Sequence, residues 1–345
     1  MSAAVTSPAA WTLDPAAFPV SGTAREQLAA LVPYAILAPS GHNTQPWRFR
    51  LLGDVLELRA DATRQLRVVD PDDRAMIISC GAAIGAARVA ARRFGLELDV
   101  RLLPGTEDAD RLAWLTVRPG AAASSDDLSR FDALLRRATN RRAYAPTPLP
   151  APLVARVVAA AARHGVTVRP VTDRAEREYV GMLVDEGDRI QASDPAFRAE
   201  LSAWVHANSD RRGDGMPGAA FGFGELASHI GPLVMRWLDW GKVQGAKDHD
   251  LAAHAPALFV FAAPADAPAD WLACGMALLD VLLELTSVGV ACSFLNQPVE
   301  VAALRGSLQA FLALEARPQL VLRAGYAEEV AHTPRRPAAE VLELA

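Results

Sequence analysis

The most chemically suggestive part of this 345-residue chain is a loop at residues 39–47, which reads PSGHNTQPW. Turn-forming and amide residues gather there, between a predicted helix that starts at Thr23 and a predicted strand over residues 47–52. Such a loop can hydrogen-bond a flat polar heterocycle. The alternative is an ordinary turn in which Ser40 and Asn43 only satisfy backbone groups. The candidate binding residues are Pro39, Ser40, Gly41, Asn43 and Gln45.

The loop resembles, without a gap, the motif Pro-Ser-x-x-Asn-x-Gln-Pro-Trp of the FMN-dependent nitroreductase superfamily. The phrase DPDDRAMIISCGAA at residues 70–83 is similar to the Acg-type branch of that superfamily, and the resemblance covers most of residues 25–340. In ordinary nitroreductases two identical subunits form each flavin site, and this motif reaches across to the FMN held mainly by the partner. The resemblance therefore implies that residues 39–45 form a reach-across loop of an FMN site.

Two basic clusters extend the resemblance. Residues 136–144, RRATNRRAY, are similar to the family's opening Arg-Arg-Ser-x-Arg-x-Phe, whose cations and hydroxyl bind the FMN phosphate. Residues 333–337, TPRRP, stand where the family has its final phosphate-binding basic pair. Arginine suits a phosphate because its planar fork makes paired, charge-assisted hydrogen bonds. The implied phosphate-binding residues are Arg137, Thr139, Asn140, Arg141, Arg142, Arg335 and Arg336.

The role of each residue in the first cluster stays open. The family's serine is replaced by Thr139 or Asn140, and the alignment can shift by one residue. Either cluster alone could also be a solvated basic patch.

A third segment, GVACSFLNQP at residues 289–298, resembles the helix-to-strand passage that lies along the flavin ring in the family. There it donates a backbone N–H toward flavin N5, and a fixed donor at that position tunes the cofactor. The implied contacts are Leu295, Asn296 and Gln297. A plain core strand is the alternative, above all for Ser293 and Phe294.

The two ends of the chain carry complementary parts of this site. The first half has the loop but only Arg25 near its start, whereas the second half has the clusters but reads RHGVTVRP, residues 163–170, where the loop should recur. One FMN site per chain follows.

No catalytic side chain and no metal site are predicted. His42 is interpreted as a surface histidine, and His249 and His254 are five residues apart, the wrong spacing for one helix face. Cys80 and Cys274 are interpreted as small core residues. No carboxylate pair can be argued from the sequence.

A repeat organises the elements that must position these residues. At one offset of 194 residues, Cys80 falls on Cys274, Gly81 on Gly275, Gly95 on Gly289 and Pro104 on Pro298. Each copy reads as an apolar helix, a glycine stop, a strand and a proline break. Chance similarity between two Ala-rich helices is the alternative. Other predicted elements are helices over residues 75–94 and 128–138 and strands over residues 55–59, 112–117 and 320–323.

The expected architecture is α+β, a nitroreductase-like fold with central antiparallel-containing sheets flanked by helices. It comprises an N-terminal arm at residues 1–20 and two pseudo-twofold-related halves at residues 21–122 and 128–337. Residues 194–250 have no counterpart in the first half. Their glycines suit a mobile lid, in which Met216, Phe221 and Phe223 would cover a flavin face. A disordered surface loop is the alternative.

Composition limits the choice of partners. Apolar residues are 51% and charged residues 22% of the chain, which suits a soluble globular protein. The net charge of -5 argues against nucleic-acid or anionic-membrane partners. The apolar stretch at residues 271–295 contains Asp280 and Glu284, so a buried helix and strand are expected in place of a membrane span. Three cysteines without CxxC spacing and the lack of a secretory signal favour the cytoplasm.

Two functions are compatible with these features. The first is an FMN-dependent oxidoreductase, in which NADPH or NADH passes a hydride to FMN and a small organic acceptor then takes the electrons. The second is an FMN-binding or FMN-sequestering protein with little turnover, because in Acg-type relatives a lid covers the flavin. A monomer and a homodimer are both compatible with the sequence.

Overall fold

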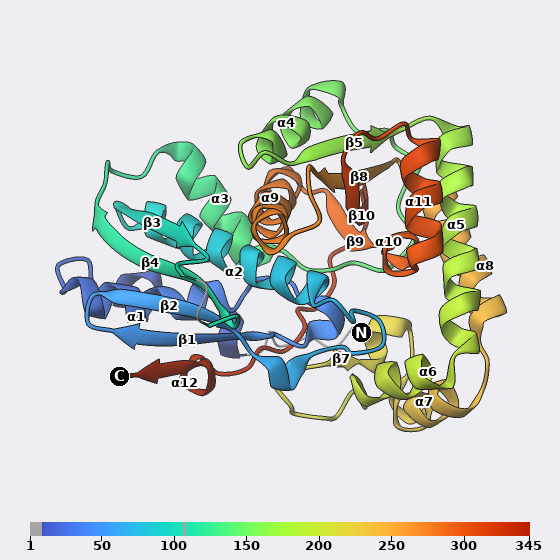
Figure 1. The fold of residues 1–345 in the computed structure, drawn as a ribbon, viewed down its shortest axis with the longest axis horizontal. Coiled ribbons are helices and arrows are strands. Elements are labelled where there is room, and N and C mark those ends of the chain that lie inside the picture. The colour runs from blue at the N-terminus through green and yellow to red at the C-terminus, as the bar shows by residue number, and fades with distance from the viewer. Residues whose placement is uncertain (1–8, 106–107) are drawn as a thin grey trace.

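Two mostly antiparallel sheets and a central pair of helices organise the molecule (Figure 1). The computed structural model describes residues 9–105 and 108–345, so the first eight residues of the expected arm lie outside the described residues. The first half contains α1 (Ala24–Ala35), β1 (Trp47–Leu52), β2 (Val55–Ala60), α2 (Arg74–Arg93), β3 (Leu96–Leu102) and β4 (Arg111–Pro119).

Local sequence explains where several of these elements begin and end. Thr23 and Glu26 form a capping box at the start of α1, in which the Glu26 carboxylate accepts from the Thr23 N–H at 2.7 Å. Gly95, with φ of 71°, ends α2, and Gly53, with φ of 56°, lies in the turn between β1 and β2. The predicted helix over residues 75–94 and the strand over residues 47–52 are confirmed.

The second half repeats this pattern with additions. Its main elements are α3 (Ser125–Arg136), α4 (Ala151–Ala162), β5 (Thr167–Val171), β8 (Ala257–Ala263), α9 (Pro268–Ser287), β9 (Ala291–Phe294), α10 (Gln297–Glu300), α11 (Ala302–Phe311) and β10 (Arg317–Gly325). The chain closes with α12 (Ala338–Val341) and β11 (Leu342–Leu344).

The two sheets share one topology. The strand order is β11-β1-β2-β4-β3 in the first sheet and β5-β8-β10-β9 in the second. Strands β1, β2, β4 and β3 therefore correspond to β5, β8, β10 and β9, and all of these neighbours are antiparallel. Strand β11 joins the first sheet parallel to β1, with Leu342 opposite Phe49. The fold is α+β with two pseudo-twofold-related halves, and the C-terminal segment ties the second half to the first.

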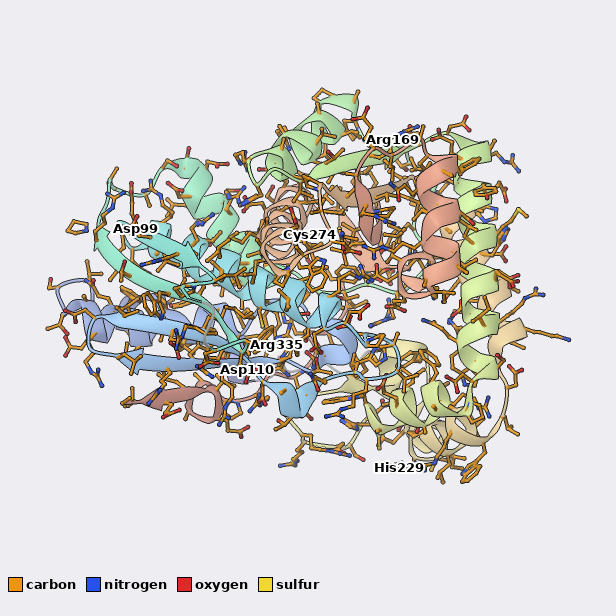
Figure 2. The ribbon with its side chains drawn as sticks, in the orientation of Figure 1. Asp99, Asp110, Arg169, His229, Cys274 and Arg335 are labelled. Atoms are coloured by element: carbon orange, nitrogen blue, oxygen red, sulfur yellow. The ribbon has the colours of Figure 1, made fainter. Side chains whose placement is uncertain are left out.

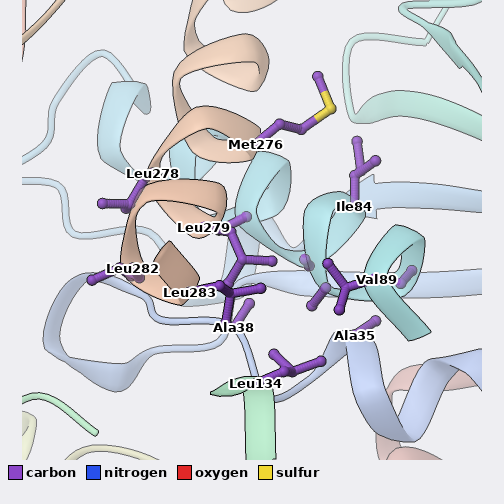
Figure 3. Packing of buried hydrophobic residues seen from close by; sticks show 14 of the residues in the cluster. Ala35, Ala38, Ile84, Val89, Leu134, Met276, Leu278, Leu279, Leu282 and Leu283 are labelled. Atoms are coloured by element: carbon purple, nitrogen blue, oxygen red, sulfur yellow. The ribbon is translucent and has the colours of Figure 1, made fainter. Parts of the chain in front are cut away.

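Helices α2 and α9 meet at glycines. A Cβ on Gly81 would lie 2.2 Å from the carbonyl oxygen of Leu272, and one on Gly275 would lie 1.9 Å from that of Ile78. Leu272 and Gly275 stand 194 residues after Ile78 and Gly81, which is the spacing of the sequence repeat. Each half thus makes the same contact with the other, as in a twofold interface. Figure 3 shows the surrounding apolar side chains, among them Leu279 of α9.

Substitution Gly275→Ala is expected to destabilise the fold by about 1–3 kcal/mol, because the new methyl group would overlap backbone atoms of α2. Gly306→Ala in α11 is the matched control, since a Cβ there meets nothing within 4 Å. Alanine is favoured over glycine in a helix by about 1 kcal/mol. Thermal unfolding should therefore show a lower Tm for the first variant and an unchanged or higher Tm for the second. Equal changes in Tm would contradict the tight crossing.

Helix α2 is long and apolar enough to cross a membrane by length and composition alone. Most of its residues are buried within the protein, where they pack against α9 and the first sheet. It is a core helix of the fold. The apolar stretch at residues 271–295 forms most of α9 followed by β9, as the sequence predicted.

Residues 172–256 form an insertion between β5 and β8, where the first half has only a short turn between β1 and β2. The insertion contains α5 (Arg174–Ser193), α6 (Pro195–Ala203), β6 (Val205–His206), β7 (Met216–Pro217), α7 (Glu225–Trp237) and α8 (Gly241–Ala253). The insertion begins at residue 172, before the predicted residue 194. Its first helix, α5, packs on the second sheet through Val180 and Val184. The remainder packs on the first half, because Phe197, Met216 and Met235 share a small core with Leu66 and Val69, so the disordered-loop alternative is wrong.

Candidate functional site

The loop at residues 39–45 has an unusual backbone. His42, Asn43 and Gln45 have φ of 47°, 55° and 53°, in the left-handed region that residues other than glycine rarely adopt. The Ser40 hydroxyl accepts a hydrogen bond from the Gln45 N–H at 2.9 Å, which helps to hold this shape. Strained backbone of this kind persists where the surrounding structure over-determines it, often at binding sites.

The amide side chains of the loop bind other parts of the chain. Asn43 Nδ2 donates to the carbonyl oxygen of Gly215 at 2.8 Å, and Gln45 Nε2 donates to that of Gly213 at 2.8 Å. Gln45 Oε1 accepts from the Arg336 N–H at 2.8 Å. The loop is therefore a joint between the insertion and the C-terminal segment. Both amide side chains are bonded to protein, and the implied FMN contacts of Asn43 and Gln45 stay predictions.

Arg335 is buried near the middle of the molecule, where Figure 2 labels it, and its N–H groups all donate hydrogen bonds within the protein. Its N–H groups donate to the carbonyls of residues 36–38 just after α1, to the Asn43 side-chain oxygen and to Thr333. Its N–H groups thus all have partners within the described protein, and the implied phosphate contact of Arg335 stays a prediction. Arg336 is also occupied, since it donates to the Gln45 carbonyl at 3.3 Å and lies 3.7 Å from Asp61.

Arg137 is a buried cation beside Arg335. Its Nη2 donates to the Leu37 carbonyl at 3.1 Å, and its Nε has no hydrogen-bond partner among the described residues. Burial lowers the pKa of Arg137 to about 10, and burial together with the Arg137 charge lowers the pKa of Arg335. The Trp11 ring lies 4.9 Å from the Arg335 guanidinium and 5.8 Å from that of Arg137. The described part of the N-terminal arm therefore covers both cations.

The next residues of the first cluster attach it to β9. Thr139 forms a backbone bridge with Cys292, and the Asn140 N–H donates to the Cys292 carbonyl at 2.8 Å. Asn140 Nδ2 donates to the Glu328 carbonyl at 2.8 Å. Arg142 is exposed and lies 3.2 Å from the Glu328 carboxylate, so the predicted phosphate contact of Arg142 lacks support. These residues position the cluster.

Arg141 and Arg323 are two cations of the site that form no ion pair with a carboxylate among the described residues, so they could bind an anionic ligand. Within the described residues Arg141 contacts Met216 Sδ at 3.6 Å and the Phe221 ring at 5.7 Å, and it forms no ion pair. Arg323 is buried, its guanidinium lies 4.1 Å from the Tyr144 ring, and its Nη2 donates to the Arg142 carbonyl at 2.9 Å. Its Nε and Nη1 have no hydrogen-bond partner in the described structure. Burial lowers the pKa of both guanidinium groups. Arg323 was not predicted from the sequence, although a single arginine in the apolar strand QLVLRAG was a detectable signal.

His42 belongs to the same group. Its Nε2 is buried and has no hydrogen-bond partner among residues 9–105 and 108–345. Burial, with the Arg141 charge adding to it, lowers the pKa of His42 to about 4. The residue as a whole is partly exposed, so the prediction of a surface histidine fails only for this ring nitrogen, and the ring is neutral near pH 7.

A pair of acids, buried Asp188 and partly exposed Asp248, lies near Arg323, whose charge interacts with Asp248. Gln297 Nε2 donates to Asp188 Oδ1 at 3.1 Å and to Asp248 Oδ2 at 3.3 Å, while Gln297 Oε1 and Asp188 Oδ2 lack partners within the described chain. Burial and the neighbouring Asp248 raise the pKa of Asp188 to about 8, and burial raises the pKa of Asp248. The sequence did not indicate this carboxylate pair, which forms because α5 and α8 bring the two carboxyl groups together.

Leu295 and Asn296, which follow β9, form hydrogen bonds with the neighbouring strand β10. The Leu295 N–H donates to the Val321 carbonyl at 2.9 Å, and Asn296 Oδ1 accepts from the Val321 N–H at 3.0 Å. The Leu295 N–H is therefore bonded within the sheet, and the implied flavin contacts of Leu295 and Asn296 stay predictions. Gln297 alone of the three presents an unpartnered polar atom.

The unpartnered groups share a chemical character. Arg137, Arg323 and His42 offer buried N–H or ring-nitrogen groups, and Gln297 offers an amide oxygen. Buried polar groups without partners are destabilising, so such a set suits a ligand with negative charge and hydrogen-bonding edges. FMN, with its phosphate and its polar flavin edge, is a ligand of that kind. The insertion covers part of this region, since Met216 and Phe221 lie against Arg141.

Comparison with known proteins gives the following matches. No family model matches the chain. It is 31% identical over 325 residues to "Putative NAD(P)H nitroreductase Rv3131" of Mycobacterium tuberculosis (strain ATCC 25618 / H37Rv), covering 92% of this chain and 91% of the relative. It is 28% identical over 322 residues to "Putative NAD(P)H nitroreductase acg" of the same strain, covering 91% of this chain and 94% of the relative.

Two solved structures are similar over part of the chain. The FMN and NADPH-dependent nitroreductase NfnB from sphigopyxis sp. strain HMH has 22% identity and a TM-score of 0.41, covering 61% of this chain and 96% of that one. The FMN-dependent nitroreductase NfnB from Mycobacterium smegmatis, in complex with NADPH, has 17% identity and a TM-score of 0.40, covering 62% and 96%.

Proposed function

This chain belongs to the nitroreductase family, and on that premise we propose that it binds one FMN between its two halves and passes a hydride from NAD(P)H to a small organic acceptor. The observation that carries the proposal is the set of buried, unpartnered groups on Arg323, Arg137 and His42, where the loop at residues 39–45 meets the second half. The bound FMN would supply the hydride chemistry.

The residues of this chain would bind and orient the cofactor. Arg141, Arg323 and Arg137 would hold its anionic groups, because their N–H groups are free of carboxylate partners within the described residues. Neutral His42 and the Gln297 amide oxygen would take its polar edges. The loop at residues 39–45 would contribute its backbone, since Asn43 and Gln45 use their side chains elsewhere.

Substitution Arg141→Ala is expected to raise the dissociation constant for FMN by about 10-fold to 150-fold, because a charge-assisted hydrogen bond is worth about 1.5–3 kcal/mol. Arg142→Ala is the matched control: it removes the adjacent arginine, which is exposed and pairs with Glu328. Its effect should stay below about twofold, since exposed ion pairs contribute little. Flavin fluorescence titration measures both constants. Equal affinities of the two variants would contradict the proposed role of Arg141.

A second candidate function, storage of FMN with little turnover, is favoured by how firmly the insertion is held. Gly213 and Gly215 accept hydrogen bonds from Gln45 and Asn43, and Asp214 forms an ion pair with Arg64. Residues 213–215, called the strap below, thus attach the insertion to the first half at the point where Met216 and Phe221 cover Arg141. If the strap stayed closed after FMN bound, a nicotinamide would be denied access to the flavin.

A further inference from the structure

Helix α7 in the insertion has apolar residues on both of its faces. Its inner face packs on the insertion through Ser228, Gly231 and Met235, which are buried. Its outer face carries large apolar side chains at a helical spacing of four, three and four residues. These are Leu226, Ile230, Leu233 and Trp237, which are 84%, 60%, 59% and 71% exposed.

The outer face of a helix on a soluble monomer is normally polar. Here the stripe continues into Val234 and Leu238, which are 44% and 59% exposed. Helix α7 lies at the edge of the molecule, remote from both sheets (Figure 1), and Figure 2 shows His229 of this helix at the rim. Because these side chains are exposed, neither half of the described structure buries the stripe.

We propose that α7 is the contact surface of a homodimer, in which the α7 helices of two copies pair antiparallel about a twofold axis. The inference is independent of the function proposed above. It rests on the size of the stripe and on the charges at its two ends.

The size of the stripe suits a protein partner. With side chains of about 100–250 Å² each, the exposed fractions leave on the order of 700 Å² of apolar surface. Patches on monomers reach about 300–600 Å², whereas each partner of a standard interface buries about 800 Å². Pairing the stripe with its own copy would supply an interface of ordinary size.

The charges select an antiparallel second copy. Glu225 stands at the first residue of α7 and Arg236 in its last turn. In an antiparallel pair, Glu225 of each copy comes beside Arg236 of the other, whereas a parallel pair would bring like charges together. A bilayer surface fits less well, because helices that lie on membranes are rich in Lys and Arg on the polar face and this helix has one arginine.

The test is the mass of the protein in solution across a range of micromolar concentrations, measured by sedimentation equilibrium. The full chain is expected to form dimers, and Leu233→Glu is expected to raise the dimer dissociation constant at least about 100-fold by placing a charge in the stripe. Met182→Glu is the matched control, since Met182 is 60% exposed on α5 and outside the stripe. It should dimerise like the wild type. Circular dichroism checks that both variants are folded.

Charge reversal tests the antiparallel arrangement. Glu225→Arg and Arg236→Glu should each weaken self-association, because an antiparallel pair then brings like charges together, whereas a parallel pair has like charges at both contacts already. An equimolar mixture of the two variants should form heterodimers, because both contacts then join opposite charges. A wild type that stays monomeric, a Leu233→Glu variant that still dimerises, or a mixture with no preference for heterodimers would each overturn the proposal. So would a monomer that sediments with neutral or anionic lipid vesicles, which would assign the stripe to a membrane surface.

Discussion

Replacing residues 213–224 by a short Gly-Ser linker is expected to accelerate the anaerobic reduction of bound flavin by NADPH by about 100-fold, if the closed insertion leaves about 1% of the molecules open. The linker removes the hydrogen bonds to Asn43 and Gln45 and the Phe221 ring over Arg141. FMN should stay bound, because Arg141, Arg323 and His42 lie outside the deleted segment. Stopped-flow absorbance would measure the rate of flavin bleaching.

A finer pair of variants controls for damage to the insertion. Phe221→Ala removes the ring beside Arg141, whereas Phe223→Ala removes a similar ring that packs on Gly231 of α7. Only the first should accelerate bleaching. Rapid bleaching of the wild type, or a shortened protein that keeps FMN and bleaches no faster, would show that the insertion does not gate the site. The storage function would then lose its structural basis.

The second large effect is expected at the acid pair. Asp188→Asn should stabilise the protein at pH 8, because it removes a carboxyl group that the fold holds buried beside Asp248. The folded pKa of about 8 lies above the usual 3.8, so the folded state retains a proton that the unfolded chain releases. Wild-type stability from this group is therefore full below about pH 4 and falls as pH rises to about 8.

The advantage of the variant should grow with pH. Between pH 5 and pH 8 the difference in unfolding free energy should widen by up to about 1.4 kcal/mol per pH unit. Asp250→Asn, an exposed acid on the same helix as Asp248, is the control and should change stability by less than about 0.5 kcal/mol at every pH. Urea unfolding at several pH values measures both. A constant difference for Asp188→Asn across this range would mean that the group carries no raised pKa.

Much of the architecture was predictable because local signals agreed with it. The capping box at Thr23, the glycine stop at Gly95 and the alternating apolar strands each define an element by short-range physics. The 194-residue repeat also placed Gly81 and Gly275 in register, although the sequence did not reveal that a helix crossing needs both glycines. The extent of the insertion was less predictable, because α5 packs on the second sheet and reads like any core helix.

The sequence indicated which regions of the chain meet, whereas the individual FMN contacts stay predictions. The loop at residues 39–45 and the clusters were correctly singled out as parts that meet, but the sequence could not show that Arg335 saturates its N–H groups on carbonyls after α1. Asp188 and Asp248 are 60 residues apart on separate helices, so no spacing rule pairs them. The burial of His42 Nε2 was not predictable, because it depends on segments distant in the sequence, such as the one that contains Arg141.

The central claim is one FMN site formed by two complementary halves. It is tested most directly by saturating the purified protein with FMN, removing free cofactor, denaturing the complex and measuring released FMN per chain by absorbance. The predicted result is one FMN per chain, because the loop at residues 39–45 lies in the first half only, whereas Arg141 and Arg323 lie in the second half. Two FMN per chain, or none after reconstitution, would contradict the account.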